Sequence, residues 1–505
     1  MANSERKKGV LLSYVSSLLL IAVNIFITPF LIRSLGDAEY GVYQMMASFG
    51  GYLVLMNFGT GTVMARFVSE FLSKKDKQGE RNFIATCFVI TACLVTLIAV
   101  ASVVMFSFID EIYKGSLNAL QLQKAKMLFV IIAVNMIINM IWQAFQGIVT
   151  AYEKFVFNNS LSIVRTVLKA GLLLLIFLFF TDSLAIALVD LFISLVFLVG
   201  YSIYTFGVLK VRPKFYKFDK PVFLSAGFLA LAVMLQAVVN QVNLHVDTTI
   251  LGIMVSPESV TTYSVAMQIF QVFTSLSTAA VFIYLPKFTK LVSSGETSGK
   301  VLCEHIIPPS RVQTLVSGAI TFGFFICGRD FIYMWMGEGY EFSWYVGIII
   351  MIPTFFVYTN SVIEAVLDAM KKRMVKSVVL AVSALVNVFI SIVLVYFLGE
   401  VGAPLGTAIT TVAGSLIVLN LYYRKAIGLS LRELFFGIFK GILPCLLIAT
   451  AVSLPLFILI PVSVWGLFVK GGVFVAVLFA ALMIFGFNKE EKDIVVKFLK
   501  GKGIH

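Results

Sequence analysis

Runs of about 20 apolar residues recur along the whole chain, and they constrain the fold more than any other feature of the sequence. A helix of that length rises about 30 Å, which is the thickness of the hydrocarbon core of a membrane. Of the 505 residues, 60% are apolar and 13% are charged, whereas an average soluble protein is about 25% charged. A chain of this composition cannot keep its apolar surface out of water. We therefore predict an all-α integral membrane protein.

Polar breaks between the apolar runs predict fourteen membrane-spanning helices. The expected spans are 10–32, 41–64, 83–106, 126–148, 160–180, 184–208, 222–252, 260–285, 312–328, 345–368, 377–398, 404–423, 438–460 and 466–487. They group into an N-terminal lobe (1–209), a basic linker (210–221), a C-terminal lobe (222–423) and a terminal pair of spans with a tail (424–505).

Lysine and arginine are distributed unevenly between the two sets of alternating connections. The termini and every second loop carry 31 of the 39 basic residues, and Arg165 and Lys169 lie within a span. The opposite connections carry only six, namely Arg33, Lys114, Lys124, Lys126, Arg329 and Lys470. Because basic residues are retained on the cytoplasmic side, we predict a multi-pass protein of the cell membrane with both termini in the cytoplasm.

The two halves resemble each other weakly, at a nearly constant offset. Tyr43, near the start of the second span, lies 220 residues before Tyr263, and Gln146 lies 218 residues before Glu364. Six spans repeated in one orientation imply two six-helix lobes related by a pseudo-two-fold axis along the membrane normal. Such an arrangement predicts a substrate site between the lobes.

Polar side chains follow one face of three predicted spans. The stripes are Asn135, Asn139, Gln143 and Gln146; Asn158, Ser162, Arg165 and Lys169; and Gln236, Asn240, Asn243 and Asp247. Each stripe advances by three helical turns, so its members share a face. The amides of a single stripe are equally explained as packing contacts between helices. Three stripes on helices of both halves favour a polar cavity, which is where intramembrane polar groups usually face.

The length of the apolar run places the two charges of the middle stripe at different depths in the membrane. The ten residues from Gly171 to Phe180 cover about 15 Å, which is half a bilayer. The helix must therefore begin near Asn159, which places Lys169 close to the midplane and Arg165 nearer the cytoplasmic side. For both residues the alternative is that the side chain extends until its charged group reaches the lipid headgroups. This alternative suits Arg165 better than Lys169.

Acidic residues within the spans are candidates for ion coupling. Asp247 lies beside His245 toward the outer end of its span, and Glu364 and Asp368 are one turn apart near the inner end of theirs. His245 has two candidate roles, a proton relay beside Asp247 or a structural hydrogen bond. For the two acids the alternative is interfacial solvation or pairing with the lysines at 371 and 372.

Several function classes are excluded. No Gly-rich phosphate loop with its Lys and Ser/Thr is present, so the chain does not hydrolyse ATP, and no nucleophile and base form a motif. The five cysteines are isolated, with neither a disulfide framework nor metal-ligand spacing. Most of the basic residues behind the net charge of +13 lie between the spans and do not form a nucleic-acid-binding motif. We expect a protein that is not an enzyme, binds no nucleic acid or cofactor, and draws on a proton or sodium gradient.

Three stretches together resemble one family. TPFLIRSLGDAEYGVYQ (28–44) resembles the first-hairpin signature of polysaccharide exporters in the multidrug/oligosaccharidyl-lipid/polysaccharide (MOP) superfamily. VDTTILGIM and TTYSVAMQI, within 246–269, are similar to the entry into their second half, and LGEVGAPLGTAITT (398–411) is similar to their junction of the eleventh and twelfth spans. The resemblance covers nearly the whole chain, but it assigns no individual substrate residue.

The resemblance implies a flippase that moves an undecaprenyl-pyrophosphate-linked oligosaccharide to the outer leaflet by alternating access between two six-helix lobes. Its partners would be this lipid-linked substrate, membrane lipid and other polysaccharide-assembly membrane proteins. In related lipid II flippases a terminal helix pair forms a groove for the lipid tail, and spans thirteen and fourteen are candidates for the same role.

From the stripes, we expect the sugar to contact the amides and the pyrophosphate to be attracted by the basic side chains. The candidate substrate-binding residues are Arg33, Asn135, Asn139, Gln143, Arg165, Lys169, Asn240 and Asn243, and the candidate ion-coupling residues are Asp247, Glu364 and Asp368.

Two alternatives remain open. A cation-coupled drug antiporter of the same superfamily usually stops at twelve spans and favours an acidic lumen, which the terminal pair and Lys169 argue against. A membrane glycosyltransferase, polymerase or ligase generally presents a large outer loop with catalytic residues, whereas the expected outer loops here have about 18 residues or fewer.

Overall fold

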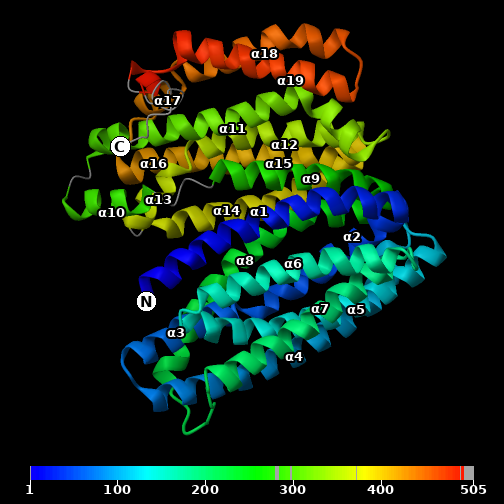
Figure 1. Cartoon of the computed structure of the whole chain (residues 1–505), viewed down its shortest axis with the longest axis vertical. Coiled ribbons are helices and arrows are strands. Elements are labelled where there is room, and N and C mark those ends of the chain that lie inside the picture. The colour runs from blue at the N-terminus through cyan, green and yellow to red at the C-terminus, as the bar shows by residue number, and fades with distance from the viewer. Residues whose placement is uncertain (1, 279–283, 296–297, 371, 490, 494–505) are drawn as a thin grey trace. The chain divides into compact units, whose positions relative to one another are not determined.

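The computed structural model describes residues 2–278, 284–295, 298–370, 372–489 and 491–493, and it divides into two compact units between Thr261 and Thr262. Every long element of the described chain is a helix (Figure 1). This confirms the prediction of an all-α protein. It follows from the sequence because a helix satisfies all of its backbone hydrogen bonds within one segment, which lipid requires.

The N-terminal unit contains the helices up to the start of α9. They are α1 (Ala2–Leu35), α2 (Asp37–Gly51), η1 (Tyr52–Asn57), α3 (Thr60–Ser73), α4 (Lys77–Tyr113), α5 (Ala119–Ala151), α6 (Phe155–Phe177), α7 (Ser183–Ile203), η2 (Tyr204–Val208), α8 (Lys220–Met254) and α9 (Pro257–Thr278), which crosses the division. Within this unit α5, α6 and α7 pack against one another, and α1 packs on α6.

The C-terminal unit is built around the long helix α11. Its elements are α10 (Leu285–Ser293), α11 (Gly299–Met336), α12 (Glu341–Thr359), α13 (Val362–Ala369), α14 (Arg373–Leu398), η4 (Gly399–Val401), α15 (Gly402–Thr410), η5 (Thr411–Val418), α16 (Leu419–Ile427), α17 (Leu431–Phe439), α18 (Ile442–Leu459), α19 (Val464–Ala481) and η6 (Leu482–Gly486). Helices α12, α17, α18 and α19 all contact α11.

Among the described residues, eleven helical segments are long and apolar enough to cross a membrane. One of them, Met374–Ile427, contains two expected spans that are separated at Gly399. The expected spans 41–64 and 260–285 are not among the eleven. The protein is therefore a multi-pass membrane protein, while the count of fourteen spans and the orientation of the termini stay predictions.

The second expected span is not one helix. It is divided into α2, η1 and α3, because Phe58 and Gly59 both adopt left-handed backbone conformations, with φ of 49° and 62°. The side chains of Asn57 and Thr60 join across this break through a hydrogen bond. Asn57 Nδ2 also donates to Gln143 Oε1 on α5, at 2.9 Å. Broken helices are tolerated in membrane proteins where neighbouring groups satisfy the freed backbone.

The expected basic linker 210–221 lies within the N-terminal unit, and α8 after it also belongs to that unit. The reason is packing: α8 contacts α2, η1 and α3. Ser48 Oγ of α2 lies 3.3 Å from His245 Nδ1, and Tyr52 Oη of η1 lies 3.2 Å from Thr249 Oγ1. The structural role that we considered for His245, a hydrogen bond, is present.

Ionic contacts attach α19 and the segment after it to α11, and α18 packs on both helices. Asp330 of α11 and Lys470 of α19 form a salt bridge of 2.8 Å, and their side chains are 0% and 1% exposed. Lys470, which we grouped with the outer connections, falls inside the expected span 466–487. It lies within α19, where Asp330 compensates its charge. At the other end, Arg311 of α11 contacts Glu491 at 2.8 Å and donates to the carbonyl of Gly486.

Candidate functional site

The site is built around Lys169, the residue that the middle stripe singled out. Helix α6 begins at Phe155, four residues before the start that we expected, and it continues unbroken to Phe177. Lys169 is therefore near the middle of a continuous helix. Its side chain is 41% exposed and its Nζ lies 2.7 Å from Oδ1 of Asp190 on α7. The Lys169 charge is thus already compensated.

Asp190 also receives two other partners. Tyr43 Oη of α2 lies 3.5 Å from Asp190 Oδ2, and Arg165 interacts electrostatically with the same carboxylate. Side chains from α2, α6 and α7 therefore converge on one acidic group that is 20% exposed. We call Tyr43, Arg165, Lys169 and Asp190 the Lys169 cluster.

Arg165 does not extend to the end of its helix. Its guanidinium lies over the ring of Trp142 of α5, at 5.3 Å, and over that of Phe197 of α7, at 5.8 Å. A guanidinium stacked on aromatic faces is attracted by their quadrupoles while its donors stay available to a ligand. The two positive charges of α6 consequently have different surroundings, one carboxylate and one aromatic.

The amides of the α5 stripe reach the same region. Asn139 Nδ2 donates to Ser194 Oγ on α7, at 3.1 Å, and to Asn135 Oδ1, at 2.9 Å. Trp142 Nε1 donates to Asn139 Oδ1 at 3.0 Å. The stripe thus holds α5 to α7 and positions the indole on which Arg165 stacks. Gln143 is used differently, since it binds Asn57 at the break in the second span.

The stripe on α8 divides along its length. Gln236 and Asn240 are exposed and hydrogen-bond to each other, at 3.2 Å, whereas Asp247 is buried at 4% exposure. The side chain of Asn243 lies outside the described residues. The structure therefore brings the α5 and α6 stripes together around α7, and it does not join the exposed α8 amides to them.

The remaining candidates have other surroundings within their own units. Glu364 of α13 forms a salt bridge with Lys376 of α14, and Lys372 donates to the carbonyl of Ala426, at 2.8 Å. Glu364 is therefore paired one helical turn beyond the lysines that we considered. Asp368 is partly buried on α13, and Arg33 is exposed in the last turn of α1.

Asp190 is the candidate site residue that sequence reasoning missed. It is the one charged residue between 184 and 209, so it interrupts an apolar span as conspicuously as Lys169 does. An intramembrane acid near an intramembrane base in the adjacent helix is a signal for a pair. That rule would have found it. No stripe was visible on that span, which is why the search by spacing passed over it.

The motif at 28–44 has a structural role beside the cluster. Glu39 accepts from Lys124 at 2.7 Å and from the backbone of Ser183 at 2.7 Å, which connects α2, α5 and α7. Gly41 lies so close to Pro257 that a Cβ atom would be 2.0 Å from its carbonyl oxygen. The first-hairpin motif therefore packs directly on the start of the second-half motif.

Comparison with known proteins identifies the family of the chain. A family model described as "Polysaccharide biosynthesis protein" matches residues 7–292, which is more than half of the chain. The chain belongs to the polysaccharide biosynthesis protein family. It is also 20% identical to EpsK, an uncharacterized membrane protein of Bacillus subtilis (strain 168), with 96% of each chain covered.

Comparison with solved structures shows which fold this chain has. The lipid II flippase MurJ, in an inward closed conformation, matches with a TM-score of 0.72 and 15% identity, covering 96% of this chain and 100% of that one. A multidrug resistance MATE family transporter of the MOP superfamily, inward-facing, matches with a TM-score of 0.64 and 15% identity, covering 82% and 94%. The chain therefore has the MOP superfamily fold.

Proposed function

We propose that the protein is a flippase of the cell membrane that moves an undecaprenyl-pyrophosphate-linked oligosaccharide from the cytoplasmic to the outer leaflet. The observation that carries the proposal is membership in a polysaccharide biosynthesis family by a chain with the MOP transporter fold. The solved structure with a TM-score of 0.72 is that of a lipid II flippase, which is support by analogy of fold.

Transport, rather than synthesis, also fits the chemistry of the chain. A sugar carried through bare hydrocarbon would leave its hydroxyls without hydrogen-bond partners, at several kcal/mol each. A polar path with amides and charged groups removes that barrier. Asn135, Asn139 and Gln143 of α5 and Asn240 and Asn243 of α8 are the amides that we assign to the sugar.

The Lys169 cluster is the proposed pyrophosphate site. Asp190 holds Lys169 at 2.7 Å, so the Lys169 charge is compensated inside the membrane without substrate. An arriving pyrophosphate, which carries more negative charge than one carboxylate, would compete for Lys169 and gain the stacked Arg165 guanidinium. The exchange of one anion for another offers a way to bind and release substrate without a large desolvation cost.

Alternating access would be driven by a proton or sodium gradient. Asp247 is our first candidate for the coupling carboxylate because it is buried, with Glu364 and Asp368 as further candidates. The polyprenyl tail would stay in lipid along the terminal pair α18 and α19. Fourteen spans with both termini in the cytoplasm, and Arg33 at the outer end of α1, complete the proposal.

The test reconstitutes the full chain in vesicles with a lipid-linked oligosaccharide in one leaflet and measures its appearance in the other with a membrane-impermeant glycosidase. We expect leaflet exchange. Extension or transfer of the glycan would instead show a transferase or polymerase. Efflux of cationic drugs without glycan exchange would show an antiporter.

Lys169→Ala should abolish exchange in a protein that still folds and inserts. This variant leaves Asp190 without its ion-pair partner, so folding and insertion are measured alongside exchange. The decisive variant combines Lys169→Met with Asp190→Leu, which removes both charges and leaves neither unpaired. If Lys169 binds pyrophosphate, the double variant is also inactive. Exchange restored in the double variant would mean that Lys169 only neutralises Asp190.

A further inference from the structure

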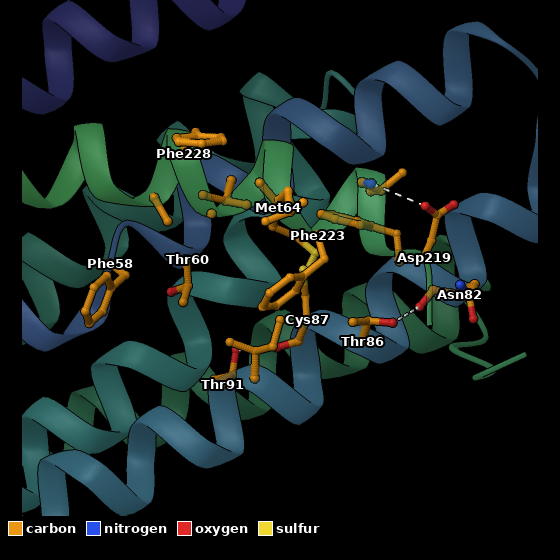
Figure 2. A pocket seen from close by; sticks show the side chains of 18 of the residues that line it. Phe58, Thr60, Met64, Asn82, Thr86, Cys87, Thr91, Asp219, Phe223 and Phe228 are labelled. Carbon is orange, nitrogen blue, oxygen red and sulfur yellow. Dashed lines mark hydrogen bonds between the residues drawn. The ribbon is translucent and has the colours of Figure 1, made fainter. Parts of the chain in front are cut away.

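An apolar cavity of about 380 Å³ lies in the N-terminal unit, away from the Lys169 cluster, between the break in the second span, α4 and the N-terminal part of α8 (Figure 2). Pockets that enclose drug-sized molecules measure about 300–1,000 Å³. Figure 2 shows Phe58 at one end of the cavity and Asp219 with Asn82 at the other, with Cys87 between them. The cavity is therefore elongated from an apolar end to a polar one.

The polar groups in the wall are already engaged within the protein. The hydroxyls of Thr86 and Thr91 donate to backbone carbonyls of α4, and Thr60 donates to Asn57. Asn82 binds the backbone of residues 216 and 217 through both amide atoms, and Asp219 accepts from the backbone of Val222. Since these partners satisfy the wall, the space itself suits a hydrocarbon chain and not a polar ligand.

Gly227 keeps the cavity open. It lines the cavity within the long helix α8, and a Cβ atom at this position would meet no heavy atom within 4 Å. A glycine in a helix interior costs about 1 kcal/mol relative to alanine, and here no close helix contact requires it. Beside it, Leu224, Phe228 and Leu231 line the cavity and are also 48%, 73% and 52% exposed. The cavity is thus open toward exposed apolar side chains of α8.

Basic residues are concentrated in the two segments that meet at the polar end of the cavity. The start of α4 and the loop before α8 meet there, since Lys214 N donates to the carbonyl of Arg81 at 3.2 Å and Asn82 binds the backbone of Lys217. The exposed basic side chains of the two segments are Lys75, Lys77, Arg81, Arg212, Lys214, Lys217 and Lys220.

The acids of the two segments, Asp76, Glu80 and Asp219, offset only three of these seven cations. Glu80 is buried at 6% exposure and accepts a hydrogen bond from Tyr152. Partial burial, together with that bond, raises the pKa of Tyr152, so the phenol remains a donor. Asp76 and Asp219 cap the helices α4 and α8. A concentration of positive charge beside a hydrocarbon-lined space is the arrangement that recognises anionic lipid headgroups.

We propose that this cavity is a binding site for an anionic phospholipid of the cytoplasmic leaflet, with one acyl chain between α3, α4 and α8 and its phosphate at the basic rim formed by residues 75–81 and 212–220. The proposal uses the predicted orientation, in which both loops are cytoplasmic. It does not use the substrate assignment, because the lipid is a resident of the membrane and not cargo.

The test titrates the purified full-length protein with dioleoyl phosphatidylglycerol and measures bound lipid by native mass spectrometry. We expect specific binding, and crosslinks from a diazirine on the acyl chain to α3, α4 and α8. Gly227→Phe fills the cavity and should weaken binding about tenfold, which corresponds to roughly two methylene groups removed from contact. Gly200→Phe is the matched control, since a Cβ there also meets nothing within 4 Å but the residue does not line the cavity; it should bind like the parent.

The headgroup is tested separately. Dioleoyl phosphatidylcholine should bind at least about tenfold more weakly, and a variant with Arg212→Gln, Lys217→Gln and Lys220→Gln should lose that preference while keeping the acyl-chain crosslinks. Parental affinity in Gly227→Phe, or equal binding of the two phospholipids to the parent protein, would overturn the proposal. So would displacement of phosphatidylglycerol by equimolar polyprenyl phosphate with crosslinks in this cavity, because the site would then hold the substrate tail.

Discussion

The buried pair of Asp330 and Lys470 allows a prediction of magnitude from structure alone. Asp330 accepts from Lys470 Nζ, at 2.8 and 3.1 Å, and from the backbone of Ser463, at 3.0 Å. Asp330→Ala leaves the ammonium, 1% exposed, without its counter-ion. Removal of one partner of a buried pair costs about 3–5 kcal/mol. We expect α19 to detach locally from α11.

The double variant Asp330→Leu with Lys470→Met separates charge from packing. It buries no charge, and replacement of both partners by apolar groups is often close to neutral. One loss remains, since the Ser463 amide has no acceptor, at about 1 kcal/mol. We therefore expect the double variant to be about 2–4 kcal/mol more stable than Asp330→Ala.

Cys327 provides the assay. It lies one turn before Asp330 on α11, and a Cβ at Gly471 of α19 would be 3.6 Å from its Sγ. With the other four cysteines replaced by alanine, the rate of reaction with N-ethylmaleimide reports how often this interface opens, because only a hydrated thiolate reacts. Asp330→Ala should increase the rate by roughly two to three orders of magnitude. A parental rate in Asp330→Ala, or equal rates in single and double variants, would refute the reasoning.

Two further predictions follow from contacts in the fold. Partial burial acts to raise the pKa of Glu491, but hydrogen bonds from Arg311 and Asn488 and the Arg311 charge hold this pKa below its ordinary 4.5. The free energy that ionised Glu491 contributes to folding is therefore present above pH 4.5 and is lost as pH falls through the lowered pKa. Thermal unfolding of the parent and Glu491→Gln, compared from about pH 7 to about pH 3, should converge only at the acid end, and a gap that stays constant there would contradict this. Gly41→Ala should lower the unfolding temperature, since its Cβ would lie 2.0 Å from the Pro257 oxygen, whereas Gly171→Ala, with nothing within 4 Å, should not; equal effects would argue against the close approach.

Helix identity was predictable because it depends on local composition. Most apolar runs became single helices at the expected places, and α6 continues through Arg165 and Lys169 as the length of its apolar run required. The break at Phe58 and Gly59 was not predictable from hydropathy, since both residues lie within an apolar run. The left-handed turn there is held by Asn57 and its contact with Gln143, 86 residues away.

What the sequence by itself determined is where polar groups enter the membrane: the three stripes, the charges of α6 and the basic connections all follow from spacing and count. Only the tertiary structure decided their partners. It pairs Lys169 with Asp190, stacks Arg165 on Trp142 and compensates Lys470 with Asp330. The physical reason is that an intramembrane charge must be compensated, a requirement that sequence reveals, whereas the group that meets it is set by which helices pack together.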